Sequence, residues 1–254
     1  TSSPSSSLLL RANCAVRALR PSIVATTLAP PAARTRPTAA PIAPGLTMPT
    51  IWLASRSPRR QELLAQIGVE FDVLRLREAS GRTPDVLEVA HDSEPALHYL
   101  ERIARTKANV GWQSMVARGL EPRPVLGADT EVILDGEVFG KPADERAAKA
   151  MLARLSGRTH EVVTAVALRW QDDTHFAMST SKVTLAPLTK SAIAAYVASG
   201  EPFDKAGGYG IQGRAAAFVT RLDGSYSGVM GLPLAETAAL LARVPGPTDR
   251  QIDD

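Results

Sequence analysis

The sequence predicts an α/β domain with a mixed sheet, in which some neighbouring strands run parallel and others antiparallel. Short apolar runs alternate with amphipathic helical segments along the chain, an order typical of α/β proteins. Asp135-Gly136 and residues 171–173 each separate two strand-like runs, so each predicts a hairpin and an antiparallel pair. The chain has 254 residues, and one domain at 48–244 is the simplest division.

Local signals place the first elements. Ser57 can cap a helix that Pro58 begins and Gly68 ends, and Leu63 and Leu64 lie on its apolar face. The elements predicted up to residue 117 are a strand at 50–54, a helix from 58 to about 67, a strand at 70–76, a polar irregular stretch at 77–93 and a helix from 94 to about 117.

The second half mixes strands, hairpins and helices. A strand that starts at residue 123 is expected to break near Asp129 and to continue into a hairpin that ends at residue 142. Gly157 closes a helix at 144–157, and Thr189 can cap a short helix that ends near Gly200. The remaining predicted elements are strands at 161–170, 175–188 and 216–222 and a final helix at 232–244.

One lysine lies on the apolar side of the long helix. Lys107 follows Ile103 by four residues and so falls on the apolar stripe, which is formed by Leu97, Leu100, Ile103 and Ala104. Such a lysine can extend its aliphatic stem past the edge of the core, or it can point into a cleft and meet an anion. Taken alone, the residue favours the first interpretation.

Composition argues against a membrane or nucleic-acid partner. No apolar run approaches the roughly 18 residues that a membrane span needs. The formal charge is +3, but residues 1–47 hold five arginines and no Lys, Asp or Glu, so the other 24 basic and 26 acidic residues give −2. Only 5% of the chain is aromatic, which leaves few platforms for stacking on bases.

The ends of the chain differ from its centre. Residues 1–47 are rich in Ser, Pro, Ala and Thr and are expected to be disordered, because their apolar residues form no face to bury. They are either an organelle transit peptide or a non-native extension before Met48, and the second interpretation is favoured. Residues 245–254 are expected to be a flexible tail.

Several kinds of catalytic site are excluded by residue content. Cys14 is the only cysteine, so residues 48–254 can form no disulfide, zinc–thiolate site or Cys nucleophile, and a cytoplasmic location is expected. The four histidines show no metal-ligand spacing, and no G-x-S-x-G motif supports a Ser nucleophile. G-x-G-x-x-G occurs at 208–213, but it follows a loop and precedes a strand-like run, so a dinucleotide site is rejected.

Polar residues at the start of the first helix can bind phosphate, and two further charged residues follow strand-like runs. A helix start has unpaired N–H groups and a partial positive charge, and hydroxyls and guanidinium groups are added here by Ser55, Ser57, Arg59 and Arg60. The alternative is a capped surface helix with solvated arginines. Asp129 can hold Mg²⁺, act as a general base or cap a turn, and Lys141 can turn inward after the hairpin.

Five sequence blocks, in this order, resemble the Maf family of nucleoside triphosphate pyrophosphatases. They are LASRSPRRQELLAQIG, RIARTKA, LGADTEVILDGEVFGKP, MLARLSGRTHEVVTAVAL and YVASGEPFDKAGGYGIQG with the later GSYSGVMGLPLAET. The blocks span residues 51 to about 237 and are far more specific than a single short motif. The resemblance implies a mixed, twisted sheet flanked by helices with a deep active-site cleft, the Maf/ITPase-like fold.

The resemblance also implies an activity and a site. Members of the family hydrolyse nucleoside triphosphates to a nucleoside monophosphate and pyrophosphate with a divalent metal cation such as Mg²⁺, Mn²⁺ or Co²⁺. By position, Asp129 of GADT corresponds to the catalytic base and to a metal ligand. The implied polyphosphate-binding residues are Ser55, Arg59, Arg60, Lys107 and Lys141.

At three positions the chain is similar to the subgroup of the family that prefers dTTP and UTP, along with modified pyrimidine nucleotides. Membership of that subgroup implies a house-cleaning role. Members that act on 7-methyl-GTP tend to have Trp after the SP of the first block, SDQ for ADT and SEG for IQG. This chain has Arg59, Thr130 and Gln212 at those places. The implied partner is the nucleoside triphosphate substrate, and the oligomeric state, a homodimer included, is left open.

Two departures from the family pattern affect the site. Between Phe71 and Lys107 this chain carries more residues than the usual member, so the acidic metal ligand of that stretch is assigned to Glu88, with Glu78 as the reserve. Glu131 replaces the usual apolar residue after ADT and can alter the local charge.

A non-catalytic nucleotide-binding regulator of cell division could use the same phosphate cradle. Metal-dependent release of pyrophosphate would distinguish the enzyme from such a regulator. The sequence leaves the physiological nucleotide and the preferred metal undecided.

Overall fold

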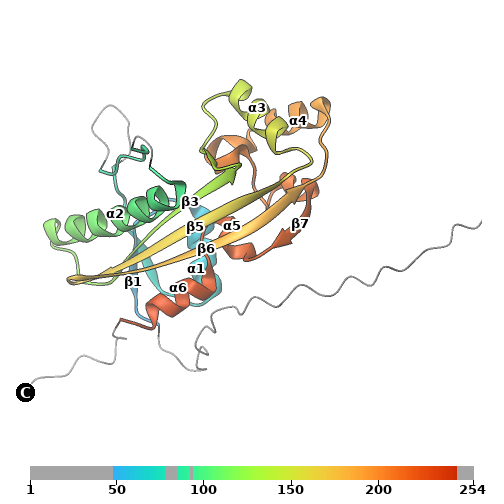
Figure 1. Cartoon of the computed structure of the whole chain (residues 1–254). Helices are drawn as coiled ribbons and strands as arrows, with labels where there is room; N and C mark the ends of the chain where they lie inside the picture. Colours follow the sequence, from blue (N-terminus) through green and yellow to red (C-terminus); the bar gives the residue numbers. More distant parts are fainter. Residues whose placement is uncertain (1–47, 78–84, 92–93, 245–254) are drawn as a thin grey trace, which may run out of the picture. The chain divides into compact units, whose positions relative to one another are not determined.

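The computed structural model describes residues 48–77, 85–91 and 94–244 (Figure 1). The predictions for residues 1–47, for the tail at 245–254 and for Glu78 lie outside this part of the chain. Residues 85–91 contain neither a helix nor a strand, as the polar composition of the stretch predicts.

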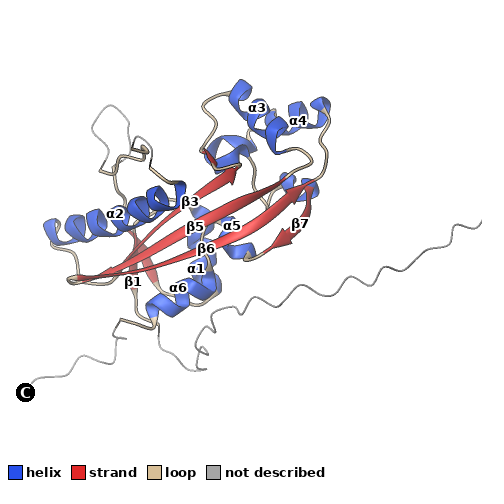
Figure 2. Cartoon of the chain, in the orientation of Figure 1, coloured by secondary structure: helices blue, strands red, loops and turns tan. Residues whose placement is uncertain are grey.

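Within the described residues, seven strands form one sheet with the order β2-β1-β3-β5-β6-β7, and β4 also pairs with β3 (Figure 2). β1 runs parallel to β2 and β3, and the other pairs are antiparallel. The predicted mixed sheet is therefore confirmed. The strands are β1 (Ile51–Leu53), β2 (Phe71–Val73), β3 (Val125–Leu134), β4 (Glu137–Phe139), β5 (Thr159–Trp170), β6 (Asp173–Leu185) and β7 (Val219–Asp223).

Helices cover both faces of the sheet (Figure 1). Successive residues of a strand point to opposite faces, and in β5 Val163 and Ala165 pack with α2 while Val166 and Leu168 pack with α1 and α6. No helix in the described part has the length and hydropathy that crossing a membrane requires. The helices are α1 (Pro58–Gln66), α2 (Ala96–Ala117), α3 (Glu145–Leu155), α4 (Lys190–Val197), α5 (Tyr226–Met230) and α6 (Leu234–Leu241), with the 3-10 turns η1 (Glu201–Asp204), η2 (Ala206–Gly208) and η3 (Arg214–Phe218).

β3 lacks a neighbouring strand along the middle of one edge. β1 pairs with β3 only at Val125 and Leu126, and β4 pairs with it only from Val132 onward. Among the described residues no strand pairs with 127–131 on this edge, whereas β5 pairs with all five on the other edge. We call the unpaired edge of β3 along residues 127–131 the β3 gap. Because no described strand lies beside this edge, side chains from both faces of β3 can meet at it.

The predicted strand break near Asp129 is wrong. β3 is continuous, and Asp129 lies in its middle, opposite Ala165 of β5. The apolar pattern is interrupted at this residue because the side chain accepts a hydrogen bond from Lys107 of α2, not because the strand ends.

Two further predictions need correction. Only part of 216–222 is a strand: η3 extends to Phe218, and β7 begins at Val219, where pairing with Leu185 of β6 begins. Leu97 does not join the buried stripe of α2 and is 47% exposed, because it lies in the first turn, before the turns that pack on the sheet.

A close contact at Gly127 sets the distance between α2 and β3. A Cβ atom at this glycine would lie 2.6 Å from the backbone nitrogen of Ala108 and 2.7 Å from the backbone oxygen of Ala104. Only a residue without a side chain allows the helix backbone to approach the strand so closely. The contact places Lys107, the residue before Ala108, directly over the β3 gap.

We expect Gly127→Ala to lower the free energy of unfolding by about 1–3 kcal/mol, because the new methyl group must push helix and strand backbones apart. Urea unfolding followed by circular dichroism measures the loss. Gly140→Ala is the matched control, since a Cβ atom there has no atom within 4 Å. Equal midpoints for both variants would contradict the close contact.

Candidate functional site

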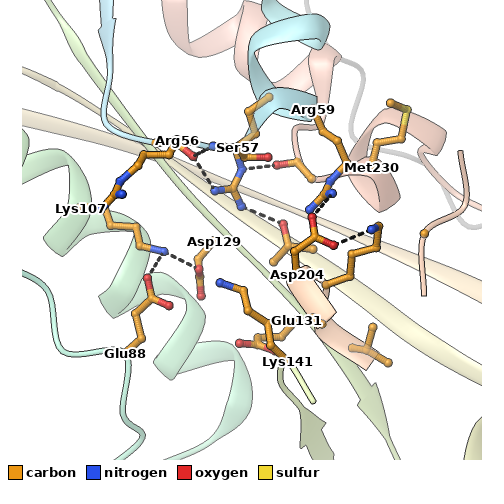
Figure 3. Close-up of a pocket in the computed structure, with 18 of the residues that line it drawn as sticks. Arg56, Ser57, Arg59, Glu88, Lys107, Asp129, Glu131, Lys141, Asp204 and Met230 are labelled. Carbon is orange, nitrogen blue, oxygen red and sulfur yellow. Dashed lines mark hydrogen bonds and ion pairs between the residues drawn. The ribbon is translucent and has the colours of Figure 1, made fainter. Parts of the chain in front are cut away.

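A cavity of about 660 Å³ opens at the β3 gap (Figure 3). Its walls come from the N-terminal end of α1, the irregular residues 86–89, the β3 gap and residues 204–212. The structure brings together here every described residue to which the sequence assigns a site role: Ser55, Arg59, Arg60, Glu88, Lys107, Asp129, Thr130, Lys141 and Gln212. Their common location is observed, and their individual roles remain predictions.

The N-terminal end of α1 presents donors to the cavity. Its first turn contains no acidic residue, and Ser57 makes no side-chain capping hydrogen bond. The backbone N–H of Ser57 instead donates to Ser55 Oγ at 3.2 Å, which turns the preceding loop back on itself. The partial positive charge of the helix end is therefore not balanced locally, and it suits an anion.

The two adjacent arginines of α1 have different surroundings. Arg60 donates from Nε to the Gly231 carbonyl at 2.8 Å, from Nη1 to Ser55 Oγ and from Nη2 to Thr130 Oγ1, both at 3.2 Å. These acceptors are neutral, so they orient the guanidinium group without cancelling its charge. Desolvation lowers the pKa of Arg60, and the nearby carboxylate of Asp129 opposes that shift.

Arg59 lies at the rim and connects α1 to η1. Its Nη1 donates to Asp204 Oδ2 at 2.9 Å, and Asp204 Oδ1 accepts from Lys205 Nζ at 2.6 Å. The Asp204 side chain is 63% exposed, so this ion pair is screened by solvent and can exchange for another anion at little cost.

Lys107 is held by two carboxylates on the opposite wall. Its Nζ lies 2.7 Å from Asp129 Oδ1 and 2.7 Å from Glu88 Oε1. Desolvation acts to raise the pKa of Glu88, but the charge and hydrogen bond of Lys107 lower it below its usual value. Glu88, the preferred residue of its stretch, therefore lies in the cavity, and the lysine on the apolar stripe points into the cleft.

Asp129 is buried and only half satisfied. The residue is 7% exposed, and Oδ1 accepts from Lys107 while Oδ2 is buried without a hydrogen-bond partner among the described residues. A buried carboxylate oxygen without a partner is costly, and it identifies the atom that a metal ion, a water molecule or a substrate would satisfy.

Glu131 adds a third carboxylate, which the sequence marked only as a departure from the family pattern. Burial raises its pKa to about 8, and the charges of Asp129 and Glu88 act in the same direction. Its Oε2 is also buried without a hydrogen-bond partner in the described part of the chain. Its position two residues after Asp129 on one strand is the sequence signal that could have indicated a shared site.

The three subgroup-specific positions lie at different depths. Thr130 Oγ1 is engaged by Arg60 and lies 2.9 Å from Thr164 Oγ1, so it supports the arginine. Arg59 and Gln212 lie at the rim, where Gln212 is exposed.

Lys141 lines the cavity and makes no hydrogen bond or ion pair with a described residue.

Tyr209 is a lining residue that sequence reasoning missed, and it is anchored by His160. His160 Nε2 lies 2.6 Å from the Tyr209 hydroxyl, and the two rings meet edge to face with centroids 5.4 Å apart. Both residues are buried, and burial lowers the pKa of His160 to about 4. His160 therefore supports the cavity wall as a neutral imidazole.

The sequence model of the family described as Maf-like protein matches residues 50–244, which include all the lining residues named above. The chain belongs to the Maf family. The mixed sheet with flanking helices and a cleft, which the resemblance implied, is thereby confirmed.

Three similar proteins carry the same functional name. A protein of Aromatoleum aromaticum is 54% identical over 192 residues, covering 75% of this chain and 93% of the relative. One from Nitrosospira multiformis is 55% identical, covering 75% and 92%, and one from Ralstonia nicotianae is 53% identical, covering 82% and 97%. Each of these three proteins is named dTTP/UTP pyrophosphatase.

We expect His160 to make this Maf-family domain less stable in acid. Its pKa of about 4 in the fold lies below the value of about 6.5 for an unfolded chain. As the pH falls from 6.5 toward 4, the unfolded chain therefore binds a proton that the folded one does not, and the free energy of unfolding decreases. The shift corresponds to at most about 3 kcal/mol. Urea midpoints at pH 7.5 and 4.5 should therefore fall further apart in the wild type than in His160→Gln. Identical pH dependence in the two proteins would show that His160 is not buried as a neutral group.

Proposed function

We propose that this chain hydrolyses nucleoside triphosphates, with dTTP, UTP and modified pyrimidine nucleotides as substrates, to a nucleoside monophosphate and pyrophosphate. The observation that carries this proposal is the convergence on one cavity of a helix N-terminus, a half-satisfied buried carboxylate and the cationic side chains of Arg59, Arg60, Lys107 and Lys141. The names of relatives that match over more than nine-tenths of their length support the substrate assignment.

Binding of the triphosphate depends on local charge, because residues 48–254 carry a formal charge of −2. Arg60 is oriented by neutral acceptors and Lys141 has no ion-pair partner among the described residues, so both can meet phosphate oxygens directly. Arg59 must exchange Asp204 for a phosphate, which its position at the rim allows. The end of α1 adds backbone donors.

Asp129 is the proposed general base. Lys107 holds one oxygen of this carboxylate, which leaves Oδ2 to take a proton from a water molecule. The water attacks the α-phosphorus, the bond from that phosphorus to the bridging oxygen breaks, and pyrophosphate leaves. Fixed cations stabilise the charge that develops on the leaving group, as in other phosphoryl transfers.

A divalent cation is part of the proposal. The half-satisfied oxygen of Asp129 and the carboxylate of Glu88 are hard oxygen donors that fit Mg²⁺, Mn²⁺ or Co²⁺, and both residues line the cavity. The two roles of Asp129 exclude each other at one oxygen, so Oδ2 either binds the cation or takes the proton. When bound, such a cation would neutralise phosphate oxygens and polarise the α-phosphorus. Lys107 contacts Glu88 through Oε1, so Oε2 is the oxygen that Glu88 can offer to the cation.

We extend the proposal to the organisation of the chain. Residues 48–244 form the catalytic domain, and this range contains every lining residue. The absence of cysteine from residue 15 onward favours a cytoplasmic enzyme.

We expect Asp129→Asn to retain the fold and to lose dTTP hydrolysis by about 10²–10⁴-fold, because an amide cannot accept the proton. Pyrophosphate release from dTTP and UTP with Mg²⁺, Mn²⁺ or Co²⁺ is the measurement, and a chelator should abolish it in the wild type. Asp173→Asn, at an exposed position of the β5–β6 hairpin, is the matched control. Wild-type activity in Asp129→Asn would remove the base role, and tight nucleotide binding without any pyrophosphate release by the wild type would favour a regulator.

We expect Gln212→Glu to shift the ratio of kcat/KM for dTTP to that for 7-methyl-GTP toward the methylated nucleotide by about tenfold, the effect of roughly 1.4 kcal/mol. The 7-methylguanine base carries a positive charge that a carboxylate at the rim would attract, while thymine is neutral. Gln171→Glu, in the turn between β5 and β6, introduces the same charge away from the cavity. An unchanged ratio would argue against base selection at Gln212.

A further inference from the structure

Glu131 places a second carboxylate beside Asp129 in the cavity. The two residues are two positions apart on β3, so their side chains leave the same face of the strand, and both line the cavity. Asp129 Oδ2 and Glu131 Oε2 are both buried and have no hydrogen-bond partner among the described residues. Figure 3 shows both carboxylates in the same part of the cavity as Lys141.

The acid at position 131 is unfavourable for folding. Burying a carboxylate oxygen without a partner is unfavourable, and an apolar side chain would avoid that cost. The local structure does not require an acid, because Ile133, the next residue on the same face of β3, is apolar and buried. A local feature that opposes folding is typical of a functional position.

Neither nearby lysine satisfies Glu131. Lys107 Nζ is taken up by Asp129 and Glu88, each at 2.7 Å, and Lys141 makes no ion pair with Glu131 or with any other described residue. A small divalent cation is the ligand whose charge best offsets two acidic side chains with buried, unpartnered oxygens.

We propose that Glu131 is a ligand of a divalent cation and that Asp129 and Glu131 together form a two-carboxylate cation site in the β3 gap. This inference deepens the proposed function and rests on it for the role of the cation in hydrolysis. The described residues contain no cluster of three or more potential metal ligands. In this geometry the other ligands are water molecules and substrate phosphates, which is the usual arrangement for Mg²⁺. Glu88 joins them only when its side chain moves closer to the other two carboxylates.

Mn²⁺ binding to the full chain without nucleotide tests the site. Electron paramagnetic resonance titration of Glu131→Gln and Glu131→Val should show a loss of Mn²⁺ affinity of about tenfold or more, relative to the wild type. Glu137→Gln, at an exposed position of β4 outside the cavity, should bind Mn²⁺ as the wild type does.

Thermal unfolding supplies a second readout that does not depend on activity. In a chelator, Glu131→Val should melt at a higher temperature than the wild type, because the unpartnered carboxylate is gone. With excess Mn²⁺ the wild type should gain more stability than the variant, since binding to the folded state stabilises it.

The outcomes separate the cation site from the proposed function. Wild-type Mn²⁺ affinity in both Glu131 variants would overturn the site, even when dTTP hydrolysis is intact. Loss of affinity in both variants supports the site. If the wild type then released no pyrophosphate from any nucleotide, the proposed function would fail while the two-carboxylate site would stand.

Discussion

The approach of α2 to β3 at Gly127 is the constraint on which the cavity depends. Because no side chain separates the two backbones, Lys107 comes within 2.7 Å of Asp129 in the middle of the sheet. The ends of β1 and β4 leave the same segment of β3 without a neighbouring strand on one edge. Helix contact and missing strand together turn the centre of a buried sheet into a place where charged groups from several elements can meet.

The cations of the cavity differ in how they are held, and this difference suggests a division of work. Arg60 is oriented by neutral oxygens from three elements, so its charge is fixed in place and not cancelled. Arg59 and Lys107 are each paired with carboxylates, one at the exposed rim and one in the buried interior. A triphosphate can therefore meet Arg60 and Lys141 directly, whereas Arg59 and Lys107 must exchange partners. Exchange at the rim costs less than exchange in the interior.

The same region contains the groups that fit the fold least well. Asp129 and Glu131 each bury an oxygen without a partner, and burial keeps the pKa of Glu131 near 8. Elsewhere β3 and β5 are lined by apolar residues that pack against helices on both faces. The stability of the domain thus comes from the two covered faces, and the β3 gap is the segment where buried acidic side chains reduce it.

The sequence by itself determined the α/β class, the position of most helices and the set of residues that would share a site. Hydrophobic periodicity and capping signals are local, and the ordered blocks LASRSPRR, RIARTKA and GADT carry the family pattern directly. The sequence could not place Asp129 inside a continuous strand, because an acidic residue in an apolar run predicts the end of a strand. It also could not show that Arg60 is oriented by neutral oxygens, that Tyr209 is anchored by His160 or that Glu131 lines the cavity. Only the tertiary structure decided these features. They follow from which strands pair with β3 and from how closely α2 packs on it, and both depend on contacts between residues far apart in the chain.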